Sequence, residues 1–151
     1  MVVKVGNNAP LFALADQDGK VWDLDEHLGK KVIVIFFYPK DDTPGCLKEA
    51  CAFRDKYEEF IKLGAEVIGI SSDDQRSHSD FVAKYNLPFR LLSDPDKKVR
   101  KEYGALDLFL PGRVTYIIDK KGIVRHVFSS QSQATKHIDE AFRMVEELSR
   151  E

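Results

Sequence analysis

Residues 32–38, VIVIFFY, constrain the fold more than any other stretch of the sequence. The run is short and rich in β-branched and aromatic side chains, which favours a strand over a helix. Because neither set of alternating side chains is polar, both faces of such a strand have to be covered. The run therefore predicts a central strand in a sheet that carries packing layers on both of its faces.

The remaining strands are expected where short apolar runs are bounded by turn residues. The sequence Asp-Gln-Asp-Gly at 16–19 predicts the turn of an N-terminal hairpin, and Lys-Lys-Gly at 120–122 predicts a second hairpin near the C-terminus. The strands are predicted at residues 11–14, 21–24, 65–71, 89–92, 113–119 and 123–128.

Helices are expected where apolar residues recur at intervals of three and four. They are predicted at residues 44–63, 77–84, 95–102 and 138–148. The third of these opens on Asp94-Pro95, which predicts an N-cap followed by proline at the first helical position. The alternation predicts an α/β fold, thioredoxin-like in its order, with a central mixed sheet flanked by helices and an N-terminal β-hairpin. With 151 residues and no linker, the chain is expected to form a single domain over residues 1–151.

Charge and hydropathy exclude several classes of partner. The chain has 23 basic and 25 acidic residues and a formal net charge of −2, so no strong field favours nucleic acid or an anionic membrane. The first residues, MVVKVGNNAP, lack the apolar segment of a secretory signal, and no apolar run reaches the length of a membrane span. These features predict a cytoplasmic protein, with a plastid location still open if a transit peptide has been removed.

The chemistry is expected in residues 39–46, which join the central strand to the first long helix. Thr43 suits the N-cap and Pro44 the first helical position, so Cys46 occupies the third. The helix dipole and the free N–H groups there favour a thiolate, and the Thr43 hydroxyl one turn away could hydrogen-bond it. Pro39 is expected to rigidify the approach to this turn. The alternative is that Cys46 is only a small buried side chain.

Cys51 lies five residues after Cys46 on the same predicted helix. Ideal helix geometry separates their Cα atoms by roughly 8.6 Å. A disulfide requires a separation below about 7 Å, so pairing would require the first turns of the helix to unwind. The alternative for Cys51 is simple packing on the helix face.

The motif Pro39-x-x-x-Thr43-x-x-Cys46 resembles the active-site signature of the peroxiredoxins. The wider run FFYPKDDTPGCLKEACAFRD, together with VIGISSDD, LPGRVTYIIDKKGIV and KHIDEA, resembles the branch known as peroxiredoxin Q or bacterioferritin comigratory protein. The resemblance implies a thiol peroxidase that reduces hydrogen peroxide and organic hydroperoxides to water and alcohols. It also implies a monomer. The sequence has no P-loop or Rossmann glycine pattern, so no cofactor beyond the thiols is expected.

The same resemblance implies roles for individual residues. Cys46 would be oxidised to a sulfenic acid, and Cys51 would resolve it as an intramolecular disulfide that thioredoxin or a similar dithiol protein reduces. Arg113, in Pro-Gly-Arg-Val-Thr-Tyr, would hold the reactive sulfur and polarise the peroxide. Glu49 departs from the glutamine of that branch, and it could either orient Arg113 or face solvent. Arg54 is a weaker candidate for the role of Arg113, because it could equally lie in a surface pair with Asp55 or Glu58.

Other features are expected to be structural. The four histidines (27, 78, 126 and 137) lack metal-ligand spacing, and the pairs Asp41-Asp42 and Asp73-Asp74 are expected to be solvated turns, so no metal is predicted. Residues 108–110 are expected in a loop that either packs on the core or forms a hydrophobic collar for substrate. Two other functions remain open on the residues alone: a thioredoxin-like disulfide exchanger, and a redox-regulated binding or holdase protein.

Overall fold

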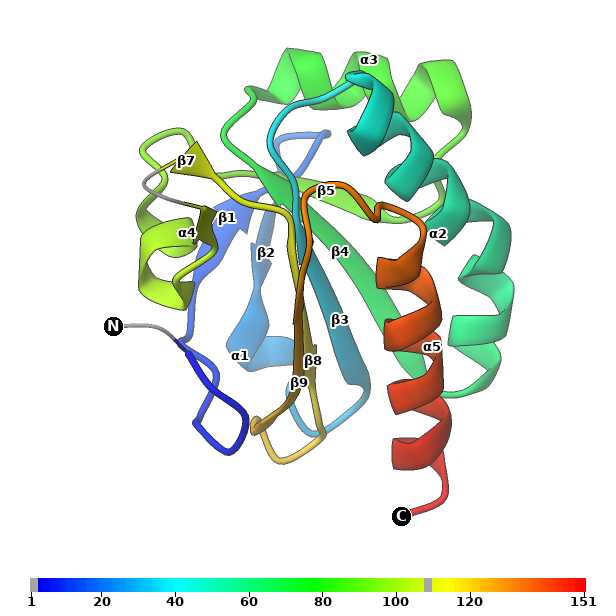
Figure 1. The fold of residues 1–151 in the computed structure, drawn as a ribbon. Coiled ribbons are helices and arrows are strands. Elements are labelled where there is room, and N and C mark those ends of the chain that lie inside the picture. Colours follow the sequence, from blue (N-terminus) through cyan, green and yellow to red (C-terminus); the bar gives the residue numbers. More distant parts are fainter. Residues whose placement is uncertain (1–2, 108–109) are drawn as a thin grey trace.

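A computed structural model describes residues 3–107 and 110–151, and its centre is a five-stranded sheet (Figure 1). The strand order is β5-β4-β3-β8-β9. All six residues of the middle strand β3 are buried, which confirms the prediction from the VIVIFFY run. The strands are β3 (Val32–Phe37), β4 (Ala65–Ser71), β5 (Arg90–Ser93), β8 (Val114–Ile118) and β9 (Val124–Ser129).

The pairing of β3 brings together the two segments that carry the predicted active-site residues, the loop after β3 and the residue before β8. β3 runs parallel to β4 and antiparallel to β8, so the sheet is mixed. In the antiparallel register, Phe37 at the end of β3 lies opposite Val114 at the start of β8. The loop that follows β3 and the residue that precedes β8, Arg113, therefore meet at one edge of the sheet.

Helices cover both faces of the sheet, as the sequence predicts. The helices α2, α3 and α5 bury one core against it, and α1, α4 and the hairpin β1–β2 bury a second core on the opposite face (Figure 1). This arrangement is the thioredoxin-like fold. The remaining elements are β1 (Ala13–Ala15), β2 (Val21–Asp23), α1 (Leu24–His27), α2 (Pro44–Lys62), α3 (Gln75–Tyr85), α4 (Lys98–Tyr103), β6 (Leu106–Asp107), β7 (Leu110–Pro111) and α5 (Lys136–Ser149).

The start of α4 differs from its prediction. Residues 95–96 form a turn, and Lys97 takes a left-handed conformation with φ 58° directly before the helix. The Asp94 carboxylate still caps the helix, but from outside this turn, because it accepts hydrogen bonds from Val99 N at 3.2 Å and Arg100 N at 2.9 Å. The Asp-Pro pair thus marks a capping turn rather than the first helical residues.

Three smaller differences concern short elements. The first hairpin is shorter and shifted by one or two residues, and the four-residue α1 follows it directly. Leu106–Asp107 pairs with Leu110–Pro111 as a small ladder. The predicted loop at residues 108–110 falls partly on residues 108–109, which lie outside the described residues.

Arg100 is a buried residue whose side chain connects the end of β3 to the segment before β8. Its side chain is 1% exposed, and its guanidinium donates to the carbonyl oxygens of Ala105 at 2.8 Å, Gly112 at 2.7 Å and Tyr38 at 2.6 Å. Tyr38 directly follows β3 and Gly112 precedes Arg113. A single buried cation therefore fixes the end of β3 relative to the approach to β8.

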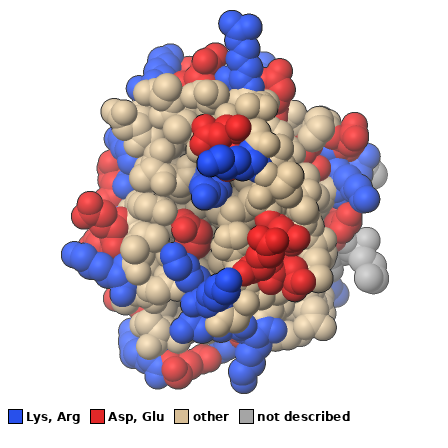
Figure 2. Space-filling view, turned by 180° about the vertical axis from the view of Figure 1, so that it is seen from behind, with Lys and Arg blue, Asp and Glu red and all other residues tan. Residues whose placement is uncertain are grey.

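The surface carries charges of both signs without a dominant patch on the face seen in Figure 2. This mixed pattern agrees with the near-neutral net charge. Within residues 3–107 and 110–151, no helix has the length and apolar character needed to cross a bilayer.

Candidate active site

The reactive turn forms where the loop after β3 enters α2. Thr43 is the N-cap residue in an extended conformation, and Pro44 begins the helix. Cys46 is the third helical residue, and its side chain is 1% exposed. The helix start therefore directs its unpaired N–H groups and positive dipole end toward this cysteine, as the sequence predicts.

Arg113 reaches the sulfur from the start of β8. Its Nη1 lies 3.5 Å from Cys46 Sγ, and its Nε donates to the Gln131 carbonyl at 3.1 Å. The guanidinium is 5% exposed, and although burial opposes its charge, the neighbouring Glu49 and Cys46 raise the pKa of Arg113. The structure thus brings together two predicted residues that are 67 positions apart.

Gly45 leaves the space that this approach requires. A Cβ atom at position 45 would lie 2.7 Å from Arg113 Nη2, well inside ordinary contact distance. Because Arg113 is held by hydrogen bonds on two sides, its guanidinium cannot retreat without breaking them. The glycine is therefore part of the geometry that holds cation and sulfur together.

Glu49 orients Arg113 and does not face solvent. Its side chain is 0% exposed, and its Oε1 accepts from Arg113 Nη1 at 2.8 Å. Burial raises the pKa of Glu49 to about 8, against the opposing effect of the guanidinium. The open alternative from the sequence is resolved in favour of a buried partner for Arg113.

His137 of α5 completes this cluster, and sequence reasoning missed it. Its Nδ1 lies 2.8 Å from the Thr115 hydroxyl and 3.6 Å from Glu49 Oε2, and its Nε2 lies 2.8 Å from the Ser130 carbonyl. Burial, with a smaller contribution from Arg113, lowers the pKa of His137 to about 4. The signal was present: His137 is four residues before the buried Ala141, on the apolar stripe of its helix.

Thr43 and Pro39 border the reactive turn in different ways. The Thr43 hydroxyl donates to the Lys40 carbonyl at 2.9 Å and makes no capping hydrogen bond to the helix. Its predicted bond to the sulfur is thus replaced here by a bond that closes the loop. Pro39 is half-buried directly after Tyr38, where the chain leaves β3.

Cys51 lies one and a half turns further along the same continuous helix. Its side chain is half-buried, and both cysteines are free. The first turn of α2 is closed by the hydrogen bond from Leu47 N to the Thr43 carbonyl at 2.8 Å. Arg54, the weaker candidate for holding the reactive sulfur, points away from it. Its guanidinium donates to Asp55 at 3.0 Å and to the Tyr85 carbonyl at 2.8 Å.

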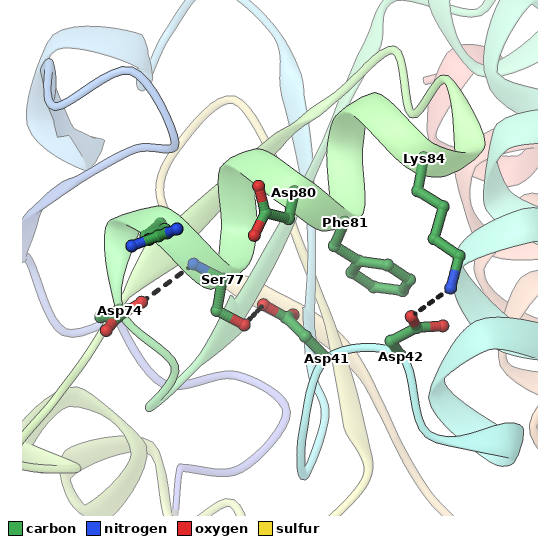
Figure 3. Close-up of a pocket in the computed structure, with 8 residues that line it drawn as sticks. Asp41, Asp42, Asp74, Ser77, Asp80, Phe81 and Lys84 are labelled. Atoms are coloured by element: carbon green, nitrogen blue, oxygen red, sulfur yellow. Dashed lines mark hydrogen bonds and ion pairs between the residues drawn. The ribbon is translucent and has the colours of Figure 1, made fainter.

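The prediction of a solvated turn at Asp41 is wrong. Asp41 is 8% exposed, and its carboxylate accepts from the Tyr38 hydroxyl at 2.6 Å and the Ser77 hydroxyl at 2.8 Å (Figure 3). It also lies 2.7 Å from Nδ1 of His78. The physical reason is that the loop after β3 folds under α3, which places Ser77 and His78 against the carboxylate. Asp41 thereby anchors the reactive loop to that helix.

Asp42 makes a second, exposed anchor from a left-handed conformation with φ 56°. Its carboxylate binds Lys84 Nζ at 2.9 Å and the Tyr85 hydroxyl at 2.7 Å, and Figure 3 shows the Lys84 bond at one side of the residues that line an acidic hollow. These hydrogen bonds lower the pKa of Asp42. The hollow lies over α3 and is lined by none of the residues around Cys46.

The described residues bring one metal-like set of donors together, at Asp41, Asp73 and His78, within 4.8 Å of one another. Protein donors already occupy their oxygen atoms: Asp41 N lies 2.8 Å from Asp73 Oδ2, and the Ser71 hydroxyl lies 2.6 Å from the same oxygen. A cation would have to displace this network. The set is best explained as part of the loop anchor.

A separate hollow of about 230 Å³ lies beside Pro44 and Gly45, the two residues before Cys46. The segment 131–135 and Lys48 also line it. The Gln131 carbonyl accepts from Arg113 Nε. The hollow therefore borders the helix start and a residue that holds the cation.

Comparison with known proteins places this geometry in a family. Residues 5–127 match the AhpC/TSA family. The chain is 55% identical to chloroplastic peroxiredoxin Q of Populus jackii over 149 residues, which cover 97% of this chain and 70% of that protein. The crystal structure of peroxidoxin BcpB from Mycobacterium tuberculosis is similar, with a TM-score of 0.90 and 35% identity over 97% of this chain and 98% of that one.

A third similarity bears on the chemistry. A bacterioferritin comigratory protein of Xanthomonas campestris, solved in work on its alkyl peroxide reduction activity, matches with a TM-score of 0.84 and 28% identity. That match covers 91% of this chain and 92% of the other. The chain therefore belongs to the AhpC/TSA family, in its peroxiredoxin Q branch, and is a thiol-dependent peroxidase.

Proposed function

We propose that Cys46 is the peroxide-reducing thiolate and that Cys51 resolves its oxidised form. The observation that carries this proposal is the 3.5 Å approach of Arg113 Nη1 to Cys46 Sγ at a helix start. The cation and the helix dipole both favour the thiolate, and the same guanidinium is available to charge that develops on the peroxide oxygens.

The first step forms one bond and breaks one. The Cys46 thiolate attacks the terminal peroxide oxygen, an S–O bond forms, and the O–O bond breaks with its electron pair on the leaving oxygen. That oxygen takes up a proton and departs as water or an alcohol. In this step Thr43 and Pro39 hold the loop that carries the cysteine, and Arg113 stabilises the leaving oxygen.

The second step requires the start of α2 to unwind. Cys51 attacks the sulfenic sulfur, the S–S bond forms, and the hydroxyl leaves as water after protonation. Because a disulfide does not fit between these positions of an intact helix, the bond from Leu47 N to the Thr43 carbonyl must open. A dithiol protein of the thioredoxin type then exchanges with the disulfide and returns both thiols.

Three further assignments belong to this proposal. The chain acts as one domain over residues 1–151, as a monomer, and sedimentation of the reduced and oxidised protein measures that state. Plant relatives are named chloroplastic, which supports a plastid location over the cytoplasmic one expected from composition.

The decisive experiment is peroxide consumption coupled to thioredoxin, thioredoxin reductase and reduced nicotinamide. Replacing Cys46 with Ser should abolish turnover, because serine is not ionised at neutral pH. Retained turnover in Cys46→Ser would refute the assignment, and a cysteine oxidation rate no faster than that of free cysteine would favour the redox-regulated binding protein.

A further inference from the structure

The carboxyl of Glu49 has no role in the steps above, although it shares a guanidinium with the reactive sulfur. Arg113 Nη1 lies 2.8 Å from Glu49 Oε1 and 3.5 Å from Cys46 Sγ. The side chains of Cys46, Glu49 and Arg113 are 1%, 0% and 5% exposed. Two groups that can each become an anion therefore compete for one buried cation.

Other charged groups near α2 are engaged elsewhere. Glu66 of β4 binds the Tyr57 hydroxyl at 2.8 Å, toward the far end of α2. On α5, Glu140 is paired with His126 of β9 and with Arg143. Lys48 of α2 is exposed.

The groups that face Glu49 are therefore few among the described residues. They are Cys46 on its own helix, Arg113 at the start of β8 and His137 on α5, with the neutral Thr115 of β8 and Ser130 after β9 behind them. Of these groups, Arg113 is the one that stays positively charged over the pH range in which the enzyme is assayed.

His137 offers no proton to Glu49 in its neutral form. A carbonyl oxygen only accepts, so the Nε2 atom that faces the Ser130 carbonyl must carry the ring hydrogen. Nδ1 is then an acceptor, and it faces the Thr115 hydroxyl at 2.8 Å and Glu49 Oε2 at 3.6 Å. Glu49 Oε2 is accordingly buried without a hydrogen-bond partner.

This geometry disfavours the ionised form of Glu49. A carboxylate would leave one buried, negatively charged oxygen opposite the lone pair of Nδ1, with no donor to compensate its lost hydration. A neutral carboxyl carries no charge on Oε2 and still accepts from Arg113 through Oε1, while the Nδ1 lone pair accepts from the Thr115 hydroxyl. If Cys46 and Glu49 were both ionised, two buried anions would share the one guanidinium that contacts them, because the second buried cation, Arg100, donates to backbone carbonyls instead.

We propose that Cys46 and Glu49 share one proton in the reduced protein, and that the reactive form has the thiolate at Cys46 and the proton on Glu49. In that form the full charge of Arg113 serves the sulfur and the leaving oxygen. Glu49 is thus a positioning residue that acts through Arg113, and the inference rests on the proposed role of Cys46. The raised pKa of Glu49 agrees with this assignment.

The test is the rate of Cys46 oxidation by hydrogen peroxide as a function of pH, in single turnover. Wild-type protein should show a rise as the thiolate forms and then an alkaline fall of about tenfold, because an ionised Glu49 diverts a charge-assisted interaction from the reacting atoms. Glu49→Gln should keep the rise and lose the fall. Glutamine preserves the oxygen that binds Arg113, but it cannot ionise.

Two controls separate this inference from its alternatives. Glu66→Gln removes a carboxyl that does not face the cluster, and it should retain the wild-type profile. His137→Asn tests whether the ring holds the proton. A fall that persists in Glu49→Gln, or that vanishes only in His137→Asn, would overturn the proposal, as would an inactive but folded Glu49→Gln protein.

An infrared measurement tests the proton without any dependence on the variant's activity. Reduced wild-type protein should show the C=O stretch of a protonated buried carboxyl at neutral pH, and this band should disappear over the pH range of the alkaline fall. Its absence would refute the shared proton. Retained peroxidase turnover in Cys46→Ser would instead refute the proposed function, so the two failures are distinguishable.

Discussion

Replacing Gly45 with Ala places a methyl group against the guanidinium of Arg113. The new Cβ would lie 2.7 Å from Nη2, whereas ordinary contact begins at 3.4 Å, so the guanidinium must withdraw. The contact from Nη1 to Cys46 Sγ is already 3.5 Å long, and little withdrawal is needed to break it. The variant therefore removes the cation from the sulfur without changing either residue.

The size of the effect follows from the interaction that is lost. A hydrogen bond to a charged group contributes about 1.5–3 kcal/mol, which corresponds to a decrease of roughly 10- to 150-fold in the rate of Cys46 oxidation. Stability should fall, because withdrawal of the buried guanidinium also breaks its bonds to Gln131 and Glu49, and the helix preference of alanine over glycine offsets at most about 1 kcal/mol of that loss. A folded but slower and less stable enzyme is the expected result.

The assay is stopped-flow oxidation by hydrogen peroxide, with urea unfolding of the same samples. Lys62→Ala, an exposed change at the opposite end of α2, should leave the rate near that of the wild type. Gly45→Ala combined with Arg113→Ala should be no slower than Arg113→Ala alone, since both act on one contact. A Gly45→Ala rate within twofold of the wild type would show that this placement of Arg113 is unnecessary.

Three further predictions concern the rest of the site. Cys51→Ser should consume one equivalent of peroxide and stop at the sulfenic acid, and mass spectrometry that finds a normal intramolecular Cys46 disulfide would exclude the resolving role. Asp41→Ala should lower the free energy of unfolding by about 2–4 kcal/mol, because the Tyr38 and Ser77 hydroxyls lose their buried acceptor; a loss below about 1 kcal/mol in urea would contradict this. Glu49→Gln should become more stable relative to wild type as pH rises from 5 to 8, by on the order of 3 kcal/mol, because the folded wild type retains a proton that the unfolded chain releases above about pH 4.3. Parallel stability curves for the two proteins would disprove that linkage.

The fold was largely predictable because the apolar residues of its core recur along the chain at the spacings of strands and helices. The VIVIFFY run predicts a strand buried on both faces, and the final helix buries Ile138, Ala141, Val145 and Leu148 at the spacing its sequence predicts. Its Phe142 is only partly buried and packs edge-on against Phe60. The start of α4 was mispredicted, since the local preference of Asp94-Pro95 for a helix start does not reveal the left-handed Lys97 between cap and helix.

The site was predictable where its residues are close in sequence or share a recognised motif. The sequence places Thr43 and Cys46 in one turn with Cys51 five residues further on, and the resemblance points to Arg113, which the structure places beside Cys46. The contacts of Glu49 with His137 and of Asp41 with His78 depend on how distant elements dock, so no local pattern encodes them. Local sequence does not reveal how deeply a side chain is buried. The Asp41 carboxyl belongs to a loop of polar residues, and only the packing of α3 against that loop removes it from solvent.

The three carbonyl contacts of Arg100 have a consequence for sequence tolerance. Ala105 and Gly112 are both held by this guanidinium, and Gly112 N also bonds to the Ala105 carbonyl at 3.1 Å. These bonds close the base of the segment between Ala105 and Gly112, so this segment can change in length without moving Arg113. Lengthening a loop whose ends are already fixed costs little free energy. This segment is therefore a place where insertions can accumulate, or a reporter peptide can be grafted, while the catalytic geometry stays intact.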